Sequence, residues 1–302
     1  MNGKVIEMVE VSPRDGLQNE KLPIATGEKL ALIARALAAG VRRIEVTSFV
    51  NPRAVPQMAD AEAVCAGLPD RDDVTYIGLV MNERGATRAL ATGRIGQLGA
   101  VSVATDQFAM ANQGQTSDGS VTAAAAIIQL ARTDGKTGQV TIGAAFGCPF
   151  EGEVSEDRVI AMAQALAEAG PVEIGLADTI GVANPAHVSR LVRRLVDAIA
   201  PIPVRVHFHN TRGTGLANVW AAIEAGARTV DAAIGGLGGC PFAPGAAGNV
   251  STEDVVFMLE RAGIETGLQL ESLIAANHWL GDVMGRQLPG MVARAPLFPR
   301  TV

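Results

Sequence analysis

Two of the four histidines in this chain, His207 and His209, are separated by a single phenylalanine in the run VRVHFHN. Branched and aromatic residues of this kind are typical of a β-strand, in which alternate side chains share a face. Both imidazoles should therefore point the same way, and with an aspartate from another strand end they could bind a divalent metal ion. The alternative is one buried and one exposed histidine without a ligand.

The pair Arg14 and Asp15 stands where the first strand-like run of the chain ends, in the sequence SPRDG. Asp15 is an aspartate at a strand end, as that metal site requires. Arg14 could be a fixed cation that stabilises a developing enolate oxygen, or it could only pair with its neighbour. Glu45 lies inside another strand-like run, where a carboxylate is costly unless it is paired or half-exposed, so we expect Arg14 to be its partner.

Asp178 follows a further strand-like run, in LADTIG, and could either take part in chemistry or cap the helix that follows. The segment 235–249, GGLGGCPFAPGAAGN, holds six glycines and two prolines and is expected to be a loop that closes over a site. In this loop Cys240 could be an acid–base thiol or a small turn residue, and Asn249 could offer a neutral oxygen to a metal. The loop lacks the Lys-Ser/Thr ending of a phosphate-binding P-loop.

These residues fall at the ends of strand-like runs that alternate with Ala- and Leu-rich helical runs. The predicted strands are 5–11, 43–48, 74–80, 100–105, 140–145, 172–177, 204–209 and 229–234. Alternation implies parallel strands, and a helix-ending glycine precedes several of them, at Gly40, Gly170 and Gly226. We therefore predict an α/β fold, a (β/α)8 TIM barrel with extra C-terminal helices, as a single catalytic domain over 1–302. The helical appendage would begin after about residue 263, and a doubly wound open sheet is the alternative fold.

The composition argues against a nucleic-acid-binding protein, a disulfide-rich protein and a membrane protein. A net charge of −6 and a pI near 5.3 argue against binding to nucleic acid. The three cysteines are odd in number and widely spaced, which argues against a disulfide framework. No signal-peptide pattern and no apolar run of about 20 residues is present, so we expect a cytoplasmic protein with no membrane segment.

Six segments of the sequence, taken in order, resemble the hydroxymethylglutaryl-CoA lyase family. The resemblance extends from about residue 5 to 275. It is carried by VEVSPRDGLQNEK at 9–21, EVTSFVNPRAVPQMAD at 45–60, GCPFEG at 147–152, LADTIGV at 176–182, VHFHNTRGTGLAN at 206–218 and GGLGGCPFAPGAAGNVSTEDVVFMLE at 235–260. That family belongs to a wider group of metal-dependent barrel enzymes that make or break bonds beside a thioester carbonyl.

The resemblance implies a role for each matching residue. One Mg2+ or Mn2+ would be held by Asp15, His207, His209 and Asn249. Arg14 would stabilise a thioester enolate, and Gln18 would help to bind the acyl-CoA substrate. Proton transfer and orientation would involve Glu45, Asp178, His207 and Cys240. The implied reaction is a retro-Claisen cleavage of the C2–C3 bond of 3-hydroxy-3-methylglutaryl-CoA to acetyl-CoA and acetoacetate, as in leucine degradation.

Three positions depart from the family pattern, and they are candidates for residues that select the substrate. Arg212 stands where a tyrosine is usual, Phe150 replaces another tyrosine, and Gly175 replaces a serine. We expect Arg212 and Phe150 to take part in substrate binding, so another 3-hydroxyacyl-CoA, such as citramalyl-CoA or a longer branched thioester, is the nearest alternative substrate. A condensing synthase and a non-catalytic binding protein are more distant alternatives. The C-terminal helices could also pack on a second subunit in a homo-oligomer.

Overall fold

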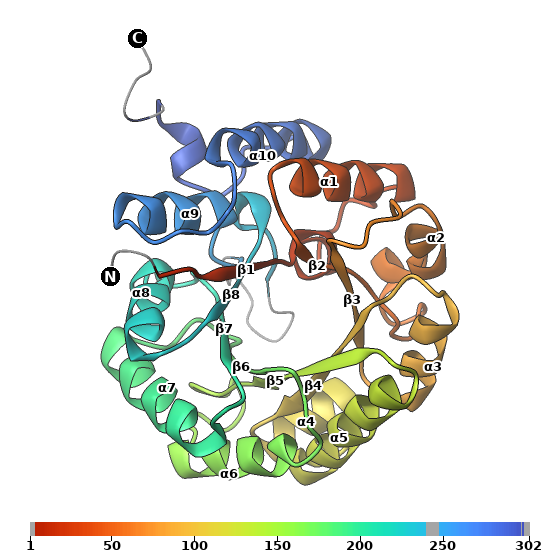
Figure 1. Cartoon of the computed structure of the whole chain (residues 1–302), viewed down its shortest axis with the longest axis vertical. Coiled ribbons are helices and arrows are strands. Elements are labelled where there is room, and N and C mark those ends of the chain that lie inside the picture. The colour runs from red at the N-terminus through yellow and green to blue at the C-terminus, as the bar shows by residue number, and fades with distance from the viewer. Residues whose placement is uncertain (1–3, 240–247, 297, 299–302) are drawn as a thin grey trace.

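The computed structural model describes residues 4–239, 248–296 and 298, in which eight parallel strands close into a barrel (Figure 1). Each strand pairs with the next along the chain, and β8 returns to pair with β1. The strands are β1 (Glu7–Glu10), β2 (Arg43–Ser48), β3 (Thr75–Val80), β4 (Gln97–Val103), β5 (Thr137–Gly143), β6 (Ile174–Asp178), β7 (Val204–Phe208) and β8 (Thr229–Ala232). The predicted (β/α)8 barrel is confirmed, and the doubly wound sheet is wrong.

A ring of helices surrounds the barrel, and the helices bury apolar faces against the sheet or against one another (Figure 1). The helices are α1 (Thr26–Ala38), α2 (Ala61–Ala66), α3 (Glu83–Ala91), α4 (Asp106–Gln113), α5 (Ser117–Thr133), α6 (Glu156–Ala167), α7 (Pro185–Ile199), α8 (Gly215–Ala225), α9 (Thr252–Arg261) and α10 (Leu270–Met284). Beyond residue 263 the chain forms α10, which lies beside α1 and α9 (Figure 1). Within the described ranges, no helix is both long enough and apolar enough to cross a membrane.

The glycines predicted to end helices adopt the backbone conformation that this role requires. Gly40, after α1, has a φ of 100°, and a Cβ atom there would come within 2.7 Å of the carbonyl oxygen of Gly267. Gly170 and Gly226 have φ values of 72° and 114°. All three lie in the left-handed region, so each can end a helix and turn the chain toward the next strand.

The observed bounds of β4 and β5 differ from the prediction, since both strands begin three residues earlier than expected. The added residues include Gln97 and Gln139, whose polar side chains do not fit the apolar pattern used to predict strands. Their amide oxygens accept hydrogen bonds from Arg43 Nη2 at 3.0 and 2.9 Å. These polar side chains are stable inside the barrel because their partner lies there too.

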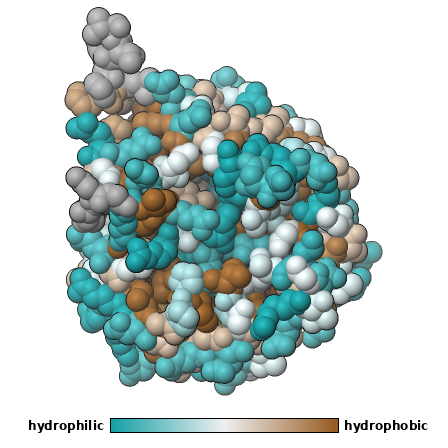
Figure 2. All heavy atoms as spheres, in the orientation of Figure 1, coloured by the Kyte–Doolittle hydropathy of each residue, from teal (hydrophilic) through white to brown (hydrophobic). Residues whose placement is uncertain are grey.

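The interior of the barrel is filled by side chains at alternate strand positions. Part of it is an ion-pair network, in which Glu173 lies 2.6 Å from Arg43 Nη2 and 3.0 Å from Arg205 Nε. A separate apolar cluster is formed by Val9, Val11, Ile77 and Ala233. On the face of the molecule shown in Figure 2, hydrophilic residues cover most of the surface, with hydrophobic patches between them.

The C-terminal helix is tied to the barrel by a buried carboxylate. Glu253, in the first turn of α9, accepts hydrogen bonds from Asn277 Nδ2 of α10 at 2.5 Å and from Gly235 N at 3.1 Å. Burial raises the pKa of Glu253 to about 7. The folded chain therefore keeps a proton on Glu253 at pH values where the unfolded chain has lost it.

Glu253 should make the protein less stable as the pH rises from about 4.5 to about 7. A group whose pKa is raised on folding stabilises the protein fully below its unfolded pKa, and this contribution is lost above its folded pKa. Glu253→Gln should remove that pH dependence, which amounts to about 3 kcal/mol at most. Melting temperatures across this pH range measure the effect, with the exposed Glu83→Gln as control. Equal profiles for wild type and Glu253→Gln would contradict the assignment.

Candidate active site

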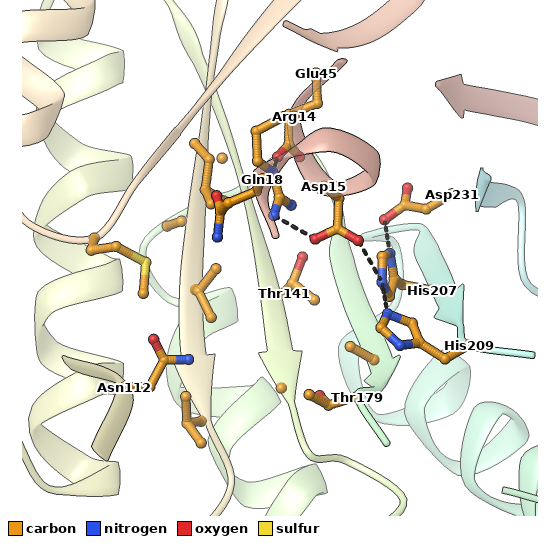
Figure 3. Close-up of a pocket in the computed structure, with 18 of the residues that line it drawn as sticks. Arg14, Asp15, Gln18, Glu45, Asn112, Thr141, Thr179, His207, His209 and Asp231 are labelled. Atoms are coloured by element: carbon orange, nitrogen blue, oxygen red, sulfur yellow. Dashed lines mark hydrogen bonds and ion pairs between the residues drawn. The ribbon is translucent and has the colours of Figure 1, made fainter. Parts of the chain in front are cut away.

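A cavity of about 190 Å³ lies at the carboxyl ends of the strands (Figure 3). Its polar lining residues include Arg14, Asp15 and Gln18 from the segment after β1, and His207 and His209 at the end of β7. Asn112 lies across the cavity from the two histidines (Figure 3). Apolar lining residues come from β3, β4 and the segments that follow them, and they include Leu79, Met81, Val101, Val103 and Phe108. The cavity therefore combines a charged cluster with an apolar surface.

The segment after β1 is a single wide helical turn, Ser12–Gly16, that brings the Arg–Asp pair to the cavity. Glu10, 1% exposed, accepts hydrogen bonds from the backbone N–H groups of Ser12 at 2.8 Å and Ile234 at 3.0 Å. Its second oxygen accepts from the Thr252 hydroxyl at 2.7 Å. Glu10 thus joins the start of the turn to the end of β8. It was not predicted, although a carboxylate inside a strand-like run was an available signal.

Arg14 is held between two carboxylates (Figure 3). Its Nε donates to Glu45, which confirms the predicted partner, and its Nη1 lies 2.5 Å from Asp15 Oδ1. Burial disfavours the charged guanidinium, but the two carboxylates outweigh burial and raise the pKa of Arg14 above its ordinary value. Arg14 is therefore a permanent cation. Its third nitrogen, Nη2, has no hydrogen-bond partner in the described part of the chain.

Asp15, His207 and His209 bring three potential ligand atoms within 4.8 Å of one another (Figure 3). His207 Nε2 lies 3.2 Å from His209 Nε2 and 3.9 Å from Asp15 Oδ2. Burial opposes ionisation of Asp15, but Arg14 and the two imidazoles hold the pKa of its carboxyl well below the usual range. Burial and the neighbouring His207 lower the pKa of His209 to about 4. At neutral pH the cluster thus offers a carboxylate and a neutral imidazole.

Two buried polar atoms beside this cluster have no hydrogen-bond partner among the described residues, namely His209 Nδ1 and Asn249 Oδ1. Asn249 donates from Nδ2 to Asp15 Oδ2 at 2.7 Å and to Leu237 O at 2.9 Å, so its side chain is fixed at the cluster. Buried polar atoms without partners are rare. Carboxylate, imidazole and amide oxygen are suitable ligands for a divalent cation. The residues present therefore fit a divalent metal ion.

Asp178 does not belong to the cavity lining. Its carboxylate accepts hydrogen bonds from the backbone N–H groups of Val182 and Ala183 at 2.9 and 3.1 Å, and so shapes the loop after β6. The cap of the following helix, α7, is instead Asn184, whose side chain accepts from His187 N. The helix-cap interpretation of Asp178 is therefore wrong, while its role in proton transfer stays a prediction.

Arg212 and Phe150, the departures expected to bind substrate, also lie outside the cavity lining. Arg212 Nη1 donates to the carbonyl oxygens of Ile180 and Gly181 at 2.8 and 2.9 Å, so its cation holds the loop after β6. The Phe150 side chain is 43% exposed, and its ring lies 5.9 Å from that of Phe108, which does line the cavity. A part for Arg212 and Phe150 in substrate binding stays a prediction.

Three further residues complete the account of the site. Gln18 lines the cavity, and its amide oxygen accepts a hydrogen bond from Ser48 Oγ at 3.3 Å. Cys240 lies outside the described residues. Asp231 was not predicted, yet it lines the cavity and its Oδ2 lies 3.2 Å from His207 Nδ1. Asp231 lies inside a strand-like run, where a carboxylate is costly unless it is paired. The reasoning used for Glu45 would therefore have identified Asp231 as well.

The profile of the HMGL-like family matches residues 5–279. The chain belongs to the HMGL-like family. It is 44% identical to the (R)-citramalyl-CoA lyase of Chloroflexus aurantiacus, over 99% of this chain and 98% of that one. It is 40% identical to a hydroxymethylglutaryl-CoA lyase of Bacillus subtilis, over 95% of each. A solved HMG-CoA lyase from Acinetobacter baumannii, in complex with coenzyme A and 3-methylmalate, is similar with a TM-score of 0.93 at 41% identity, covering 99% and 97% of the two chains.

Removing one imidazole from this HMGL-like site should weaken metal binding. His209→Ala takes away a neutral ligand and should raise the Kd for Mn2+ by more than about 100-fold. His278→Ala, in α10, removes a histidine outside the cavity lining and should leave the Kd unchanged. Calorimetric titration of the metal-stripped proteins measures both. Equal affinities for His209→Ala and wild type would rule out His209 as a ligand.

Proposed function

We propose that the chain is a divalent-metal-dependent carbon–carbon lyase that cleaves a 3-hydroxyacyl-CoA. Its proposed substrate is 3-hydroxy-3-methylglutaryl-CoA, and the products are acetyl-CoA and acetoacetate. The observation that carries the proposal is a permanent cation, Arg14, placed beside the ligand set of Asp15, His207 and His209. The lyase relatives support the reaction class. Coenzyme A in the related structure supports an acyl-CoA substrate.

The metal ion would be Mg2+ or Mn2+, held by Asp15, His207, His209 and Asn249. When bound, it would supply Lewis-acid chemistry that eases the loss of a proton from a coordinated hydroxyl. Asp15 keeps its charge because Arg14 and the imidazoles outweigh its burial, and His209 keeps a free lone pair because its pKa is about 4. Two of the ligands therefore need no deprotonation at neutral pH.

Arg14 is placed to stabilise the electron pair released by the reaction. When the C2–C3 bond breaks, that pair passes to C2 and the thioester oxygen, as the enolate of acetyl-CoA. Arg14 Nη2 would donate to the enolate oxygen, while Glu45 and Asp15 hold the other two guanidinium nitrogens. The C3 hydroxyl loses its proton and becomes the ketone of acetoacetate, and a proton added to C2 restores the balance.

The proton transfers are assigned to His207, Glu45, Asp178 and Cys240. Burial lowers the pKa of His207, but Asp231 and Asp15 outweigh it and raise that pKa above its ordinary value. His207 is therefore the more basic of the two imidazoles at the site. Asp231 fixes the ring through Nδ1, at 3.2 Å, so Nε2 is the nitrogen that faces the cavity.

Citramalyl-CoA is the second candidate substrate. It also carries a hydroxyl at C3, and its carboxylate is one methylene closer to that carbon. The relative that is 44% identical is a citramalyl-CoA lyase, which favours this thioester. Small apolar differences between substrates would be sensed by the apolar lining, which includes Leu79, Val103 and Phe108. Such differences are worth only about 1–3 kcal/mol each, so the chemistry is more strongly supported than the acyl chain.

Steady-state cleavage of both thioesters tests the proposal. We expect metal-dependent release of acetoacetate from 3-hydroxy-3-methylglutaryl-CoA. Arg14→Lys keeps the charge but loses the planar fork that contacts Glu45 and Asp15, and it should lower kcat by about 100- to 1000-fold with little change in KM. His278→Ala is the control and should keep wild-type rates.

Two other outcomes of this assay have distinct meanings. Rapid release of pyruvate from citramalyl-CoA, with slow release of acetoacetate, would keep the lyase chemistry and change the substrate. Failure to cleave either thioester, by protein that binds metal, would contradict the proposed function for these substrates and lead to a panel of longer thioesters.

We also propose a single catalytic domain, a cytoplasmic location and a place in leucine degradation. The single domain and the cytoplasmic location follow from the sequence pattern, the place in leucine degradation follows from the resemblance to hydroxymethylglutaryl-CoA lyases, and all three stay predictions. A homo-oligomer stays a prediction as well, and light scattering of the purified protein would test it.

A further inference from the structure

Buried ion pairs run through the barrel interior to the metal-ligand cluster. Arg205 of β7 is 2% exposed and lies through Nε 3.0 Å from Glu173 Oε1. Its Nη1 donates to Asp231 Oδ2 of β8. The same oxygen of Asp231 lies 3.2 Å from His207 Nδ1 (Figure 3). Arg205 therefore reaches His207 through one shared carboxylate oxygen.

Gly175 of β6 leaves the space beside the Arg205 guanidinium. A Cβ atom at Gly175 would come within 3.0 Å of Arg205 Nη2 and 3.2 Å of its Cζ. That Nη2 donates to Thr141 Oγ1 of β5 at 2.6 Å. The guanidinium is thus held by Thr141 of β5, Asp231 of β8 and Glu173 just before β6, and it packs against the bare backbone of Gly175, which restricts its orientation. The change from serine to glycine at 175, which the sequence associates with substrate choice, lies against this arginine.

We propose that Arg205 is a positioning residue for the metal site, because it fixes Asp231, and Asp231 in turn fixes the ring of His207. Arg205 can have this role only if the proposed metal-dependent function is correct. An imidazole that donates Nδ1–H to a carboxylate keeps its Nε2 lone pair for a ligand, and the position of the carboxylate sets the angle of the ring.

The single shared oxygen makes the coupling tight. Asp231 Oδ1 has no hydrogen-bond partner among the described residues, so Arg205 and His207 both bind Oδ2. A carboxylate that turned without its arginine would move the oxygen to which His207 Nδ1 hydrogen-bonds. Loss of Arg205 should therefore disturb the metal site even though the arginine is not itself a ligand.

The rival explanation is that Arg205 only fills the barrel and balances charge. Arg43 provides the matched comparison, because its guanidinium also lies inside the barrel and also pairs with Glu173, at 2.6 Å. In the part of the chain that the structure describes, Arg43 hydrogen-bonds to Glu7, Gln97, Gln139 and Glu173, and not to Asp231. Removing Arg43 takes the same charge from the interior without removing the support of His207.

Titration of the metal-stripped proteins with Mn2+, followed by electron paramagnetic resonance, separates these explanations. Arg205→Met should raise the Kd for Mn2+ by about 10- to 100-fold, and Asp231→Asn by a similar factor. The double variant should be no worse than the poorer single one, because both changes break the same support. Arg205→Lys should recover part of the affinity. Arg43→Met should keep the wild-type Kd, whatever its melting temperature.

In the cleavage assay, the loss caused by Arg205→Met should fall on kcat and leave the KM for the thioester nearly unchanged. If Arg205→Met does not fold, Gly175→Ala provides the test, since its Cβ displaces the guanidinium while every charge is kept. Gly175→Ala should also weaken Mn2+ binding.

Wild-type affinity for Mn2+ in folded Arg205→Met or Gly175→Ala, or an equal loss in Arg43→Met, would overturn the proposal. Metal affinity is measured without turnover, so the two proposals can fail separately. A wild-type protein that binds Mn2+ but cleaves no thioester would remove the lyase function and leave the Arg205 result standing. A wild-type protein that does not bind Mn2+ would overturn both.

Discussion

The interior of this barrel can hold many charged side chains only because each faces a partner of opposite sign. A buried charge that loses its partner costs about 3–5 kcal/mol. Inside the barrel this condition is met by Glu173, which pairs with both Arg43 and Arg205. At the cavity it is met by the pair of Arg14 and Glu45. A strand fixes the position of each of its side chains along the barrel axis. The ion pairs then fix the orientation of the side chains next to the candidate metal ligands Asp15 and His207. The same interactions therefore keep the barrel folded and the site in shape.

The order of elements and the place of the chemistry could be predicted from the sequence, because both depend on short-range patterns. The spacing of two put both histidines on one face, and the cost of burying Glu45 identified its arginine partner. Pairing across the barrel could not be predicted, since it depends on the register of distant strands. Gln97 and Gln139 can be buried in strands because both accept hydrogen bonds from Arg43. Arg212 was expected near substrate, and its bonds to a neighbouring loop have no sequence signature.

The site combines a charged cluster with an apolar lining, and the two differ in how far their residues can be substituted. The charged cluster around Arg14 and Asp15 is crowded with mutual contacts, so a change at one member disturbs the rest. The apolar lining that includes Leu79 and Phe108 carries few such constraints and can vary by single methyl groups. This division agrees with the names of two similar chains, which are lyases of different thioesters.

The bond between Glu10 and Thr252 joins positions 242 residues apart. β1 also pairs with β8, so one edge of the first strand stays unpaired until the last strand has been synthesised. On the ribosome, the first half of the polypeptide therefore emerges with Glu10, Arg14 and Asp15 still in water. His207 and His209 follow only when translation is two-thirds complete. A nascent chain has no assembled set of ligands, so the site that fits a divalent metal ion forms late in the maturation of the protein.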